Sequence, residues 1–114
     1  MQQIKNIPPK ILGEGIAGHY VHGASMSFGL VELKKGSAVP LHQHIHEQIT
    51  YILSGELEME IGGEKYLLTE GMYHVIPSQT PHSAIARTDC RLIDVFSPAR
   101  EEYKSPVSAE WKTV

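Results

Sequence analysis

Three histidines stand at alternate positions within one short stretch of this 114-residue chain. On a strand, the side chains of His42, His44 and His46 would point to one face, because successive residues alternate across a strand. Two imidazoles placed in this way can reach a single ion, and neutral imidazole is a common ligand of divalent transition metals. A histidine cluster can also be a solvated surface, so the surrounding residues must decide between the two interpretations.

The elements that would position these histidines are short β-rich runs separated by turn residues. Apolar residues at 57, 59 and 61 alternate with glutamates, as in a strand with one buried face, and Gly62-Gly63 is typical of a hairpin turn. Strands are predicted at residues 26–33, 38–44, 48–53, 56–61, 64–68, 73–76, 82–87 and 91–96. Strands this short with short connections favour a closed all-β barrel, because closure leaves no exposed sheet edge.

The length and composition are those of one domain with a modest core. We expect residues 1–22 to form an N-terminal arm and first strand region, residues 23–100 the barrel, and residues 101–114 a C-terminal tail. Within the first region, residues 4–16 carry Pro8-Pro9 and are predicted to be an extended arm that packs on a second subunit.

Charge and hydropathy narrow the possible partners. The net charge of −3 and the absence of a Lys/Arg run disfavour nucleic acid. The start of the chain lacks the apolar segment of a secretion signal, and no stretch approaches the ~20 apolar residues of a membrane span. A lone cysteine, Cys90, cannot form an internal disulfide. We therefore expect a cytoplasmic protein with neither a membrane nor a nucleic-acid partner.

The spacing around the histidines resembles the two motifs of the cupin family. The first motif reads Gly, five residues, His-x-His, three or four residues, Glu, six residues, Gly; it is matched by Gly36, His42, His44, Gln48 and Gly55. The second reads Gly, five residues, Pro-x-Gly, two residues, His, three residues, Asn; it is matched by Gly71, Pro77 and His82, whereas Gln79 and Ala86 replace its second glycine and its asparagine.

The resemblance implies a cupin jelly-roll barrel, also called a double-stranded β-helix, holding one divalent metal on His42, His44, Gln48 and His82. The metal could be nickel, zinc, iron or manganese. Gln48 stands where most cupins carry glutamate, and a neutral amide leaves the charge of the ion uncompensated. Such a site favours an anionic ligand, such as a substrate carboxylate or enolate oxygen. The expected partner is thus a small anionic molecule, with His46 in the pocket wall.

The end of the barrel sequence resembles the closing motif of one cupin subgroup, which also has glutamine as the fourth ligand. Members of this subgroup act in pectin and alginate degradation and linearise 4,5-unsaturated monouronates to 5-keto-4-deoxyuronate. The resemblance implies that Asp94, Phe96 and Arg100 lie in the pocket, as a general acid/base, a wall and a carboxylate clamp, respectively. The competing interpretation is an ordinary ion pair between Asp94 and Arg100 near the rim of the barrel.

These features predict a homodimeric, metal-dependent isomerase that opens the ring of an unsaturated uronate or a related sugar acid without a redox cofactor. Two alternatives stay open. One is an iron-dependent cupin dioxygenase, which would take up oxygen. The other is a non-catalytic sugar-binding cupin.

Overall fold

The computed structural model describes residues 2–104, and these residues are almost entirely β. Two short 3₁₀ helices, η1 (Ile4–Asn6) and η2 (Glu101–Tyr103), lie at the ends of the described chain. The strands are β1 (Lys10–Gly13), β2 (Ile16–His22), β3 (Ser27–Leu33), β4 (Ala38–His42), β5 (Glu47–Ser54), β6 (Leu57–Ile61), β7 (Glu64–Leu68), β8 (Tyr73–Ile76), β9 (His82–Ala86) and β10 (Cys90–Ser97).

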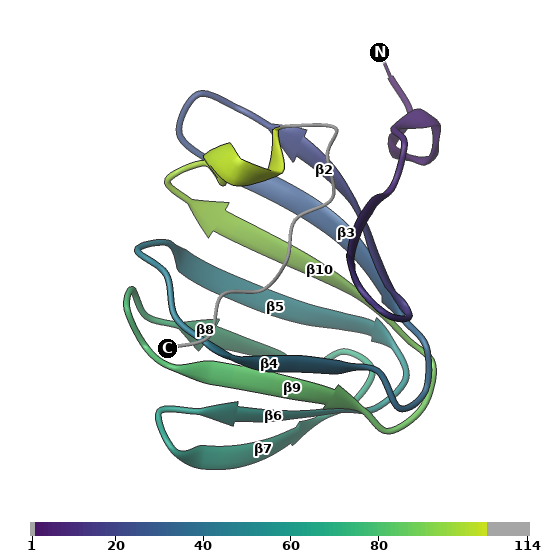
Figure 1. The fold of residues 1–114 in the computed structure, drawn as a ribbon, viewed down its shortest axis with the longest axis vertical. Helices are drawn as coiled ribbons and strands as arrows, with labels where there is room; N and C mark the ends of the chain where they lie inside the picture. Colours follow the sequence, from purple (N-terminus) through teal and green to yellow (C-terminus); the bar gives the residue numbers. More distant parts are fainter. Residues whose placement is uncertain (1, 105–114) are drawn as a thin grey trace.

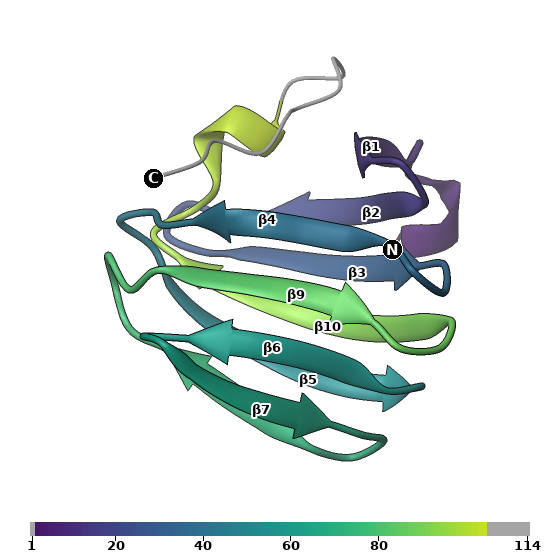
Figure 2. The same cartoon turned by 60° about the horizontal axis from the view of Figure 1, so that its bottom comes forward.

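The strands form two antiparallel sheets that face each other (Figures 1 and 2). The larger sheet has the order β1-β2-β3-β10-β5-β8, and the smaller has the order β4-β9-β6-β7. This arrangement confirms the predicted all-β jelly-roll barrel. No helix in the described part of the chain is long and apolar enough to cross a membrane.

The core lies between the two sheets, because each strand buries alternate residues. Ile52 and Ile76 have no exposed surface, and burying a side chain of this size contributes about 1.5–3 kcal/mol. Along β5 the buried residues change from Ile52 to the polar Thr50 and Gln48. The core is therefore apolar at one end of the barrel and polar at the other, and the polar end forms the candidate site.

The predicted strands correspond to β3 through β10, with ends that differ by at most two residues. The clearest difference is at β4, which ends at His42 instead of reaching residue 44. Its pairing with β9 is irregular between Val39 and His42, where Pro40 has no N–H for the sheet. The predicted hairpin joins β6 to β7, and Gly62 and Gly63 have φ angles of 58° and 85°, as a primed turn requires.

The N-terminal region differs from the predicted arm. β1 forms an antiparallel pair with β2 of the same chain, and Leu12 is 3 % exposed in the core. At the other end, Tyr103 of η2 is 5 % exposed and its ring lies 4.7 Å from that of Tyr20. Residues 105–114, the rest of the predicted tail, lie outside the described residues.

Candidate metal centre

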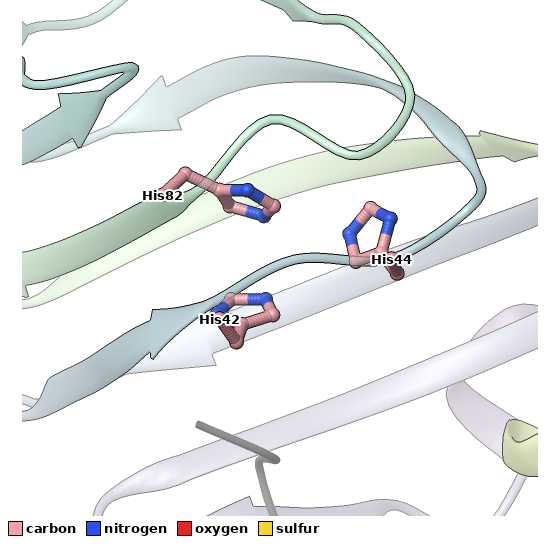
Figure 3. A group of neighbouring side chains, drawn as sticks. All are labelled: His42, His44 and His82. Carbon is pink, nitrogen blue, oxygen red and sulfur yellow. The ribbon is translucent and has the colours of Figure 1, made fainter. Parts of the chain in front are cut away.

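Three histidines converge at the polar end of the barrel (Figure 3). His42 ends β4, His82 begins β9, and the two are direct partners across these strands. His44 reaches the same place from the loop that follows β4. Nitrogen atoms of the three rings all lie within 4.8 Å of one another. Since metal–imidazole bonds are ~2.0–2.1 Å long, this spacing allows one ion to bind all three rings.

Backbone carbonyls fix the orientation of each ring. The Nδ1–H of His42 donates to the Pro40 carbonyl at 2.8 Å and that of His82 to the Thr80 carbonyl at 2.8 Å. His44 Nδ1 donates to the His46 carbonyl at 3.0 Å. A neutral imidazole carries one ring proton, so each Nε2 keeps its lone pair, as a metal ligand requires. His82 Nε2 is buried and has no hydrogen-bond partner among the described residues.

The histidines are in the protonation state that binds metal. Burial, together with the neighbouring cationic groups, lowers the pKa of His42 and of His44 to about 4. Burial also lowers the pKa of His82. All three rings are therefore neutral at pH 7, and no proton has to leave before an ion binds.

Gln48 completes the candidate ligand set from β5. Its Oε1 lies 3.1 Å from His44 Nε2. With the ring proton on Nδ1, where it is donated to the His46 carbonyl, His44 Nε2 and Gln48 Oε1 are both acceptors; with the proton on Nε2, they form a hydrogen bond. Two ligand atoms of one ion lie ~3.0–3.4 Å apart when their bonds to it are ~2.1 Å long. In the Nδ1–H tautomer a shared cation would accommodate the close approach of these two lone pairs, so the residues present fit a bound metal.

Asp94 lies directly behind Gln48, on β10. The Gln48 Nε2–H donates to Asp94 Oδ1 at 3.1 Å, and the Thr50 hydroxyl donates to the same oxygen at 2.7 Å. Gln48 also donates to Thr50 Oγ1 at 3.0 Å. Burial raises the pKa of Asp94 to about 6, although these hydrogen bonds and Arg100 oppose the shift. The carboxyl group can therefore gain or lose a proton near neutral pH.

Arg100 is held over two aromatic rings at the edge of the site. Its guanidinium carbon lies 4.7 Å from the Phe96 ring centroid and 4.1 Å from that of Tyr103. Nε donates to Glu102 at 2.6 Å, so Arg100 forms its ion pair with Glu102 and not with Asp94. Nη1 is buried and has no partner among the described residues.

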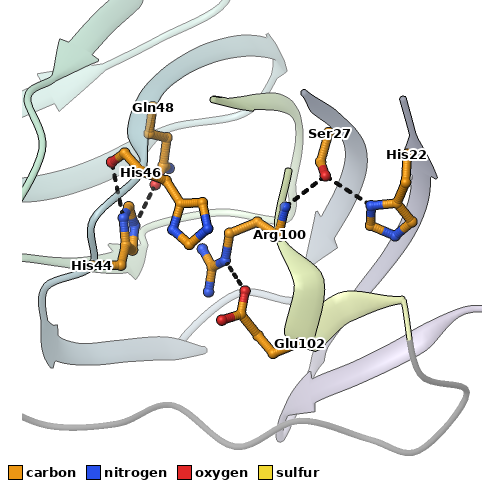
Figure 4. A network of polar contacts seen from close by, with 7 residues as sticks. All are labelled: His22, Ser27, His44, His46, Gln48, Arg100 and Glu102. Atoms are coloured by element: carbon orange, nitrogen blue, oxygen red, sulfur yellow. Dashed lines mark hydrogen bonds and ion pairs between the residues drawn. The ribbon is translucent and has the colours of Figure 1, made fainter. Parts of the chain in front are cut away.

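His46 lies between the candidate ligands His44 and Gln48 on one side and Arg100 on the other (Figure 4). Its ring centroid is 5.2 Å from that of His44 and 6.2 Å from that of Phe96. The side chain is 5 % exposed, and its Nδ1 has no partner in the described part of the chain. Burial and the charge of Arg100 lower the pKa of His46. Two buried nitrogens, one on His46 and one on Arg100, are thus available to a ligand.

A cavity of about 40 Å³ lies beside these groups. The polar side chains that line it are His42, Gln48, Thr50, His82, Ser83, Asp94 and Arg100, with Phe96 among the apolar ones. One water needs ~10–15 Å³, so the cavity has room for only a few small groups. A larger ligand must extend towards the mouth of the barrel.

The structure thus places all the predicted site residues at the same end of the barrel. Sequence reasoning missed Thr50 and Glu102, which hold Asp94 and Arg100. Thr50 follows Gln48 by two residues on the same face of β5, so strand periodicity could have identified it. Glu102 gave no comparable signal.

Comparison with known proteins agrees with this geometry. The family model described as "Cupin domain" matches residues 29–96. The chain is 31 % identical to the pectin degradation protein KdgF of Dickeya dadantii over 84 % of its own length and 90 % of the relative's. The solved structure of KdgF from Halomonas sp. superposes with a TM-score of 0.81 at 32 % identity, covering 87 % of this chain and 93 % of that one.

A second curated relative has a different activity in its name. Quercetin 2,3-dioxygenase of Bacillus subtilis is 43 % identical over 79 residues, which are 64 % of this chain. The chain spans only about a quarter of that relative, since the match covers 23 % of it. Taken with the fold and the histidine cluster, these matches show that the chain belongs to the cupin family and groups with its KdgF-like members.

Proposed function

We propose that this protein binds one divalent transition metal and isomerises a 4,5-unsaturated uronate, or a related sugar acid, to its open-chain keto form. The observation that carries the proposal is the hydrogen bond between Asp94 and the candidate ligand Gln48. It joins an acid–base group to a metal site whose protein ligands are all neutral. The likeness to the KdgF proteins of Dickeya and Halomonas supports the same substrate class.

The candidate ligands are His42, His44, His82 and Gln48. Nitrogen and oxygen donors of this kind suit nickel, zinc, iron and manganese alike. When bound, the ion would supply Lewis-acid stabilisation of negative charge on substrate oxygens. Because none of the four ligands is anionic, a substrate carboxylate would be attracted to the site.

Asp94 would carry the proton. Loss of the proton from the anomeric hydroxyl breaks the bond between C1 and the ring oxygen and leaves an aldehyde at C1. A proton added at C4 then converts the C4=C5 double bond and its oxygen into a C5 ketone. The reaction is an isomerisation, because one proton is lost and one is gained. A carboxyl group with a pKa of about 6 can take the first and deliver the second.

Arg100 and His46 would position the substrate. The buried Nη1 of Arg100 has no partner among the described residues, and a substrate carboxylate would supply one. The neutral His46 ring donates to the Ala99 carbonyl, which leaves its buried Nδ1 as an acceptor for a substrate hydroxyl. Glu102 accepts a hydrogen bond from Arg100 Nε, and the guanidinium group lies over the Phe96 ring. These contacts fix the position of Arg100 and leave its Nη1 available to the substrate. The small cavity would admit only the reacting end of the sugar, with the rest at the mouth of the barrel.

The test is the loss of ultraviolet absorbance of an unsaturated monouronate, with protein loaded in turn with nickel, zinc, iron and manganese. At least one metal should accelerate ring opening well above the uncatalysed rate. His82→Ala should abolish this rate, whereas His74→Ala, which changes a β8 histidine whose ring lies 4.7 Å from that of Tyr66, should keep it. If no metal form exceeds the uncatalysed rate, the isomerase proposal is wrong.

The likeness to quercetin 2,3-dioxygenase favours a second candidate function, an iron-dependent dioxygenase. An oxygen electrode separates the two activities, because the isomerase consumes no oxygen. The iron-loaded protein should be tested with a flavonol and with the uronate. Oxygen uptake with the flavonol, together with an unchanged uronate, would favour the dioxygenase.

A further inference from the structure

The segment that carries Arg100 is attached to β2 and β3 and not only to β10, which it follows. The backbone N–H of Arg100 donates to the hydroxyl of Ser27, the first residue of β3, at 2.8 Å. Ser27 is fully buried, and its Oγ lies 2.7 Å from Nδ1 of His22, the last residue of β2 (Figure 4). These contacts fix the backbone at residue 100. The guanidinium group stands at the end of a long side chain and needs contacts of its own.

The ring of Tyr103 provides such a contact. The guanidinium carbon of Arg100 lies 4.1 Å from the centroid of this ring, a distance at which a cation is attracted to the face of an aromatic group. The Tyr103 ring also lies 4.7 Å from that of Tyr20, and both tyrosines are buried. Tyr103 therefore joins the guanidinium group to a residue of β2. The side chain of Glu102, which forms the ion pair with Arg100, is 52 % exposed, and water weakens an ion pair at such a position.

Tyr20 in turn lies against two glycines. A Cβ added at Gly18 or at Gly29 would come within 2.8 Å of two ring carbons of Tyr20, nearer than the 3.0 Å that real Cβ atoms keep. Neither glycine has a positive φ, so the backbone would accept alanine at both positions and the ring excludes it. In the strand register Gly29 lies between Tyr20 on β2 and Asp94 on β10. The Tyr20 ring thus occupies the space that a side chain at position 29 would fill, beside the candidate acid–base group.

We propose that Tyr20 and Tyr103 are positioning residues, which hold the guanidinium group of Arg100 in place for an anionic ligand. Direct contacts run from the two glycines through the two rings to the guanidinium group. An arginine side chain that is fixed before binding loses less conformational entropy when the ligand arrives, so the ligand binds more tightly. The inference rests on the proposed function, since a substrate carboxylate is the anion that we expect at the buried Nη1 of Arg100. Loosening the rings should weaken substrate binding and leave the proton transfer at Asp94 intact.

Arginine side-chain NMR of the full chain tests the positioning without any substrate. The chain contains three arginines, so nitrogen-15 labelling gives three Nε–H signals, and the one lost in Arg100→Lys belongs to Arg100. In the wild type this signal should be displaced by the ring currents of Phe96 and Tyr103 and should exchange slowly with water. Gly29→Ala should move it towards the position of an exposed arginine and speed its exchange roughly 10-fold or more, although the added methyl group meets the Tyr20 ring first.

Gly23→Ala is the matched control, because it adds the same methyl group in the turn between β2 and β3, where nothing lies nearer than 3.6 Å. It should leave the Arg100 signal unchanged. Tyr103→Phe keeps the ring and should keep the displaced signal, whereas Tyr103→Leu removes the ring and should lose the displacement. Circular dichroism checks the fold of each variant, and Tyr103→Leu carries the test alone if Gly29→Ala does not fold. An Arg100 signal that is the same in Tyr103→Leu as in the wild type would overturn the proposal.

Steady-state kinetics with the unsaturated uronate connects the positioning to the reaction. Gly29→Ala and Tyr103→Leu should raise KM roughly 10-fold and keep kcat within about threefold of the wild type. Gly23→Ala should change neither constant. A lower kcat with an unchanged KM would show that the rings act on the proton transfer and would also overturn the proposal. If the wild type does not turn over the uronate, the proposed function is wrong, and the NMR signals still decide whether the two rings hold Arg100.

Discussion

Gln48 joins the candidate metal ligands to the candidate acid–base group. Its oxygen faces His44, and its amide N–H donates to Asp94. A glutamate at this position would place a second carboxylate about 3 Å from Asp94, where two like charges disfavour joint ionisation. Glutamine at position 48 and aspartate at position 94 are therefore compatible in a way that glutamate and aspartate are not.

We predict that Gln48→Glu separates metal binding from catalysis. An anionic ligand should hold the ion at least as tightly as the amide does. The same change removes the hydrogen bond to Asp94 and repels its charge, so kcat should fall by roughly 10²-fold or more. Metal content by elemental analysis and steady-state kinetics with the unsaturated uronate measure the two effects. Full activity in this variant would contradict a role for the Gln48–Asp94 contact.

Asp94→Asn tests the proton carrier directly. Asparagine keeps an oxygen that can accept from both Thr50 and Gln48, so the metal and the fold should be retained. The variant cannot carry the proton, and kcat should fall by about 10²–10⁴-fold with little change in KM. Asp89→Asn is the matched control, because the Asp89 side chain accepts from the Lys35 N–H in an exposed turn, away from the candidate site. An Asp94→Asn rate equal to that of the wild type would assign the proton to another group.

At the scale of the elements, the loop before β9 contains the one strained residue of the described backbone. Gln79 has a φ of 58°, a region that costs side-chain-bearing residues roughly 1–2 kcal/mol. The second cupin motif has glycine at this position. The backbone N–H of Gln79 donates to the His44 carbonyl at 2.7 Å, so the strained turn ties this loop to the loop that carries a candidate ligand.

Gln79→Gly should raise the free energy of unfolding by up to about 1 kcal/mol. Relief of the left-handed strain is worth more than the extra freedom that glycine gives the unfolded chain. Gln79→Ala is the control, because it removes the same side chain and keeps the strain. Urea unfolding followed by circular dichroism measures both variants. Equal stability of the glycine and alanine variants would show that the turn stores no strain.

The candidate metal ligands could be named from sequence because both motifs depend on spacing along local elements. His42, His44 and Gln48 are close in the chain, and His82 occupies a fixed place in the second motif. The contact of Thr50 with Asp94 was not predictable in the same way. It depends on the register of β5 against β10, which joins residues 44 positions apart. The pairing of β1 with β2 was missed because Pro8-Pro9 and the glycines around it weaken the strand pattern.

At the scale of the whole molecule, the buried histidines oppose stability in acid. Four of them, at positions 42, 44, 46 and 82, have a lowered pKa. As the pH falls below 6.5, the unfolded chain binds protons at these residues more readily than the folded chain does, so the free energy of unfolding falls with the pH. Asp94 acts in the opposite direction, because its pKa is raised to about 6. The four histidines together have a larger effect on the pH dependence of stability than Asp94 alone.

We therefore predict that the metal-free protein melts at progressively lower temperature as the pH is reduced from 7 to 4.5. Thermal unfolding in the presence of a chelator measures this dependence. His44→Asn removes one of the buried titrating rings and should make the dependence shallower. A melting temperature that stays constant, or rises, over this range would mean that the four rings are not held in the neutral form.

Metal binding should stabilise the folded protein because the four ligands come together only there. An ion at 100 times its dissociation constant adds about 2.7 kcal/mol, which for a domain of this size raises the melting temperature by on the order of 10 °C. The chelated protein should show this rise in melting temperature when metal is added back, without any substrate present.

His82→Ala removes a buried candidate ligand and should lose the rise in melting temperature. His74→Ala should keep it, because this histidine lies outside the cluster. An equal rise in both variants would place the ion elsewhere on the chain, for example on exposed histidines, and would remove the metal centre from the mechanism proposed for Asp94.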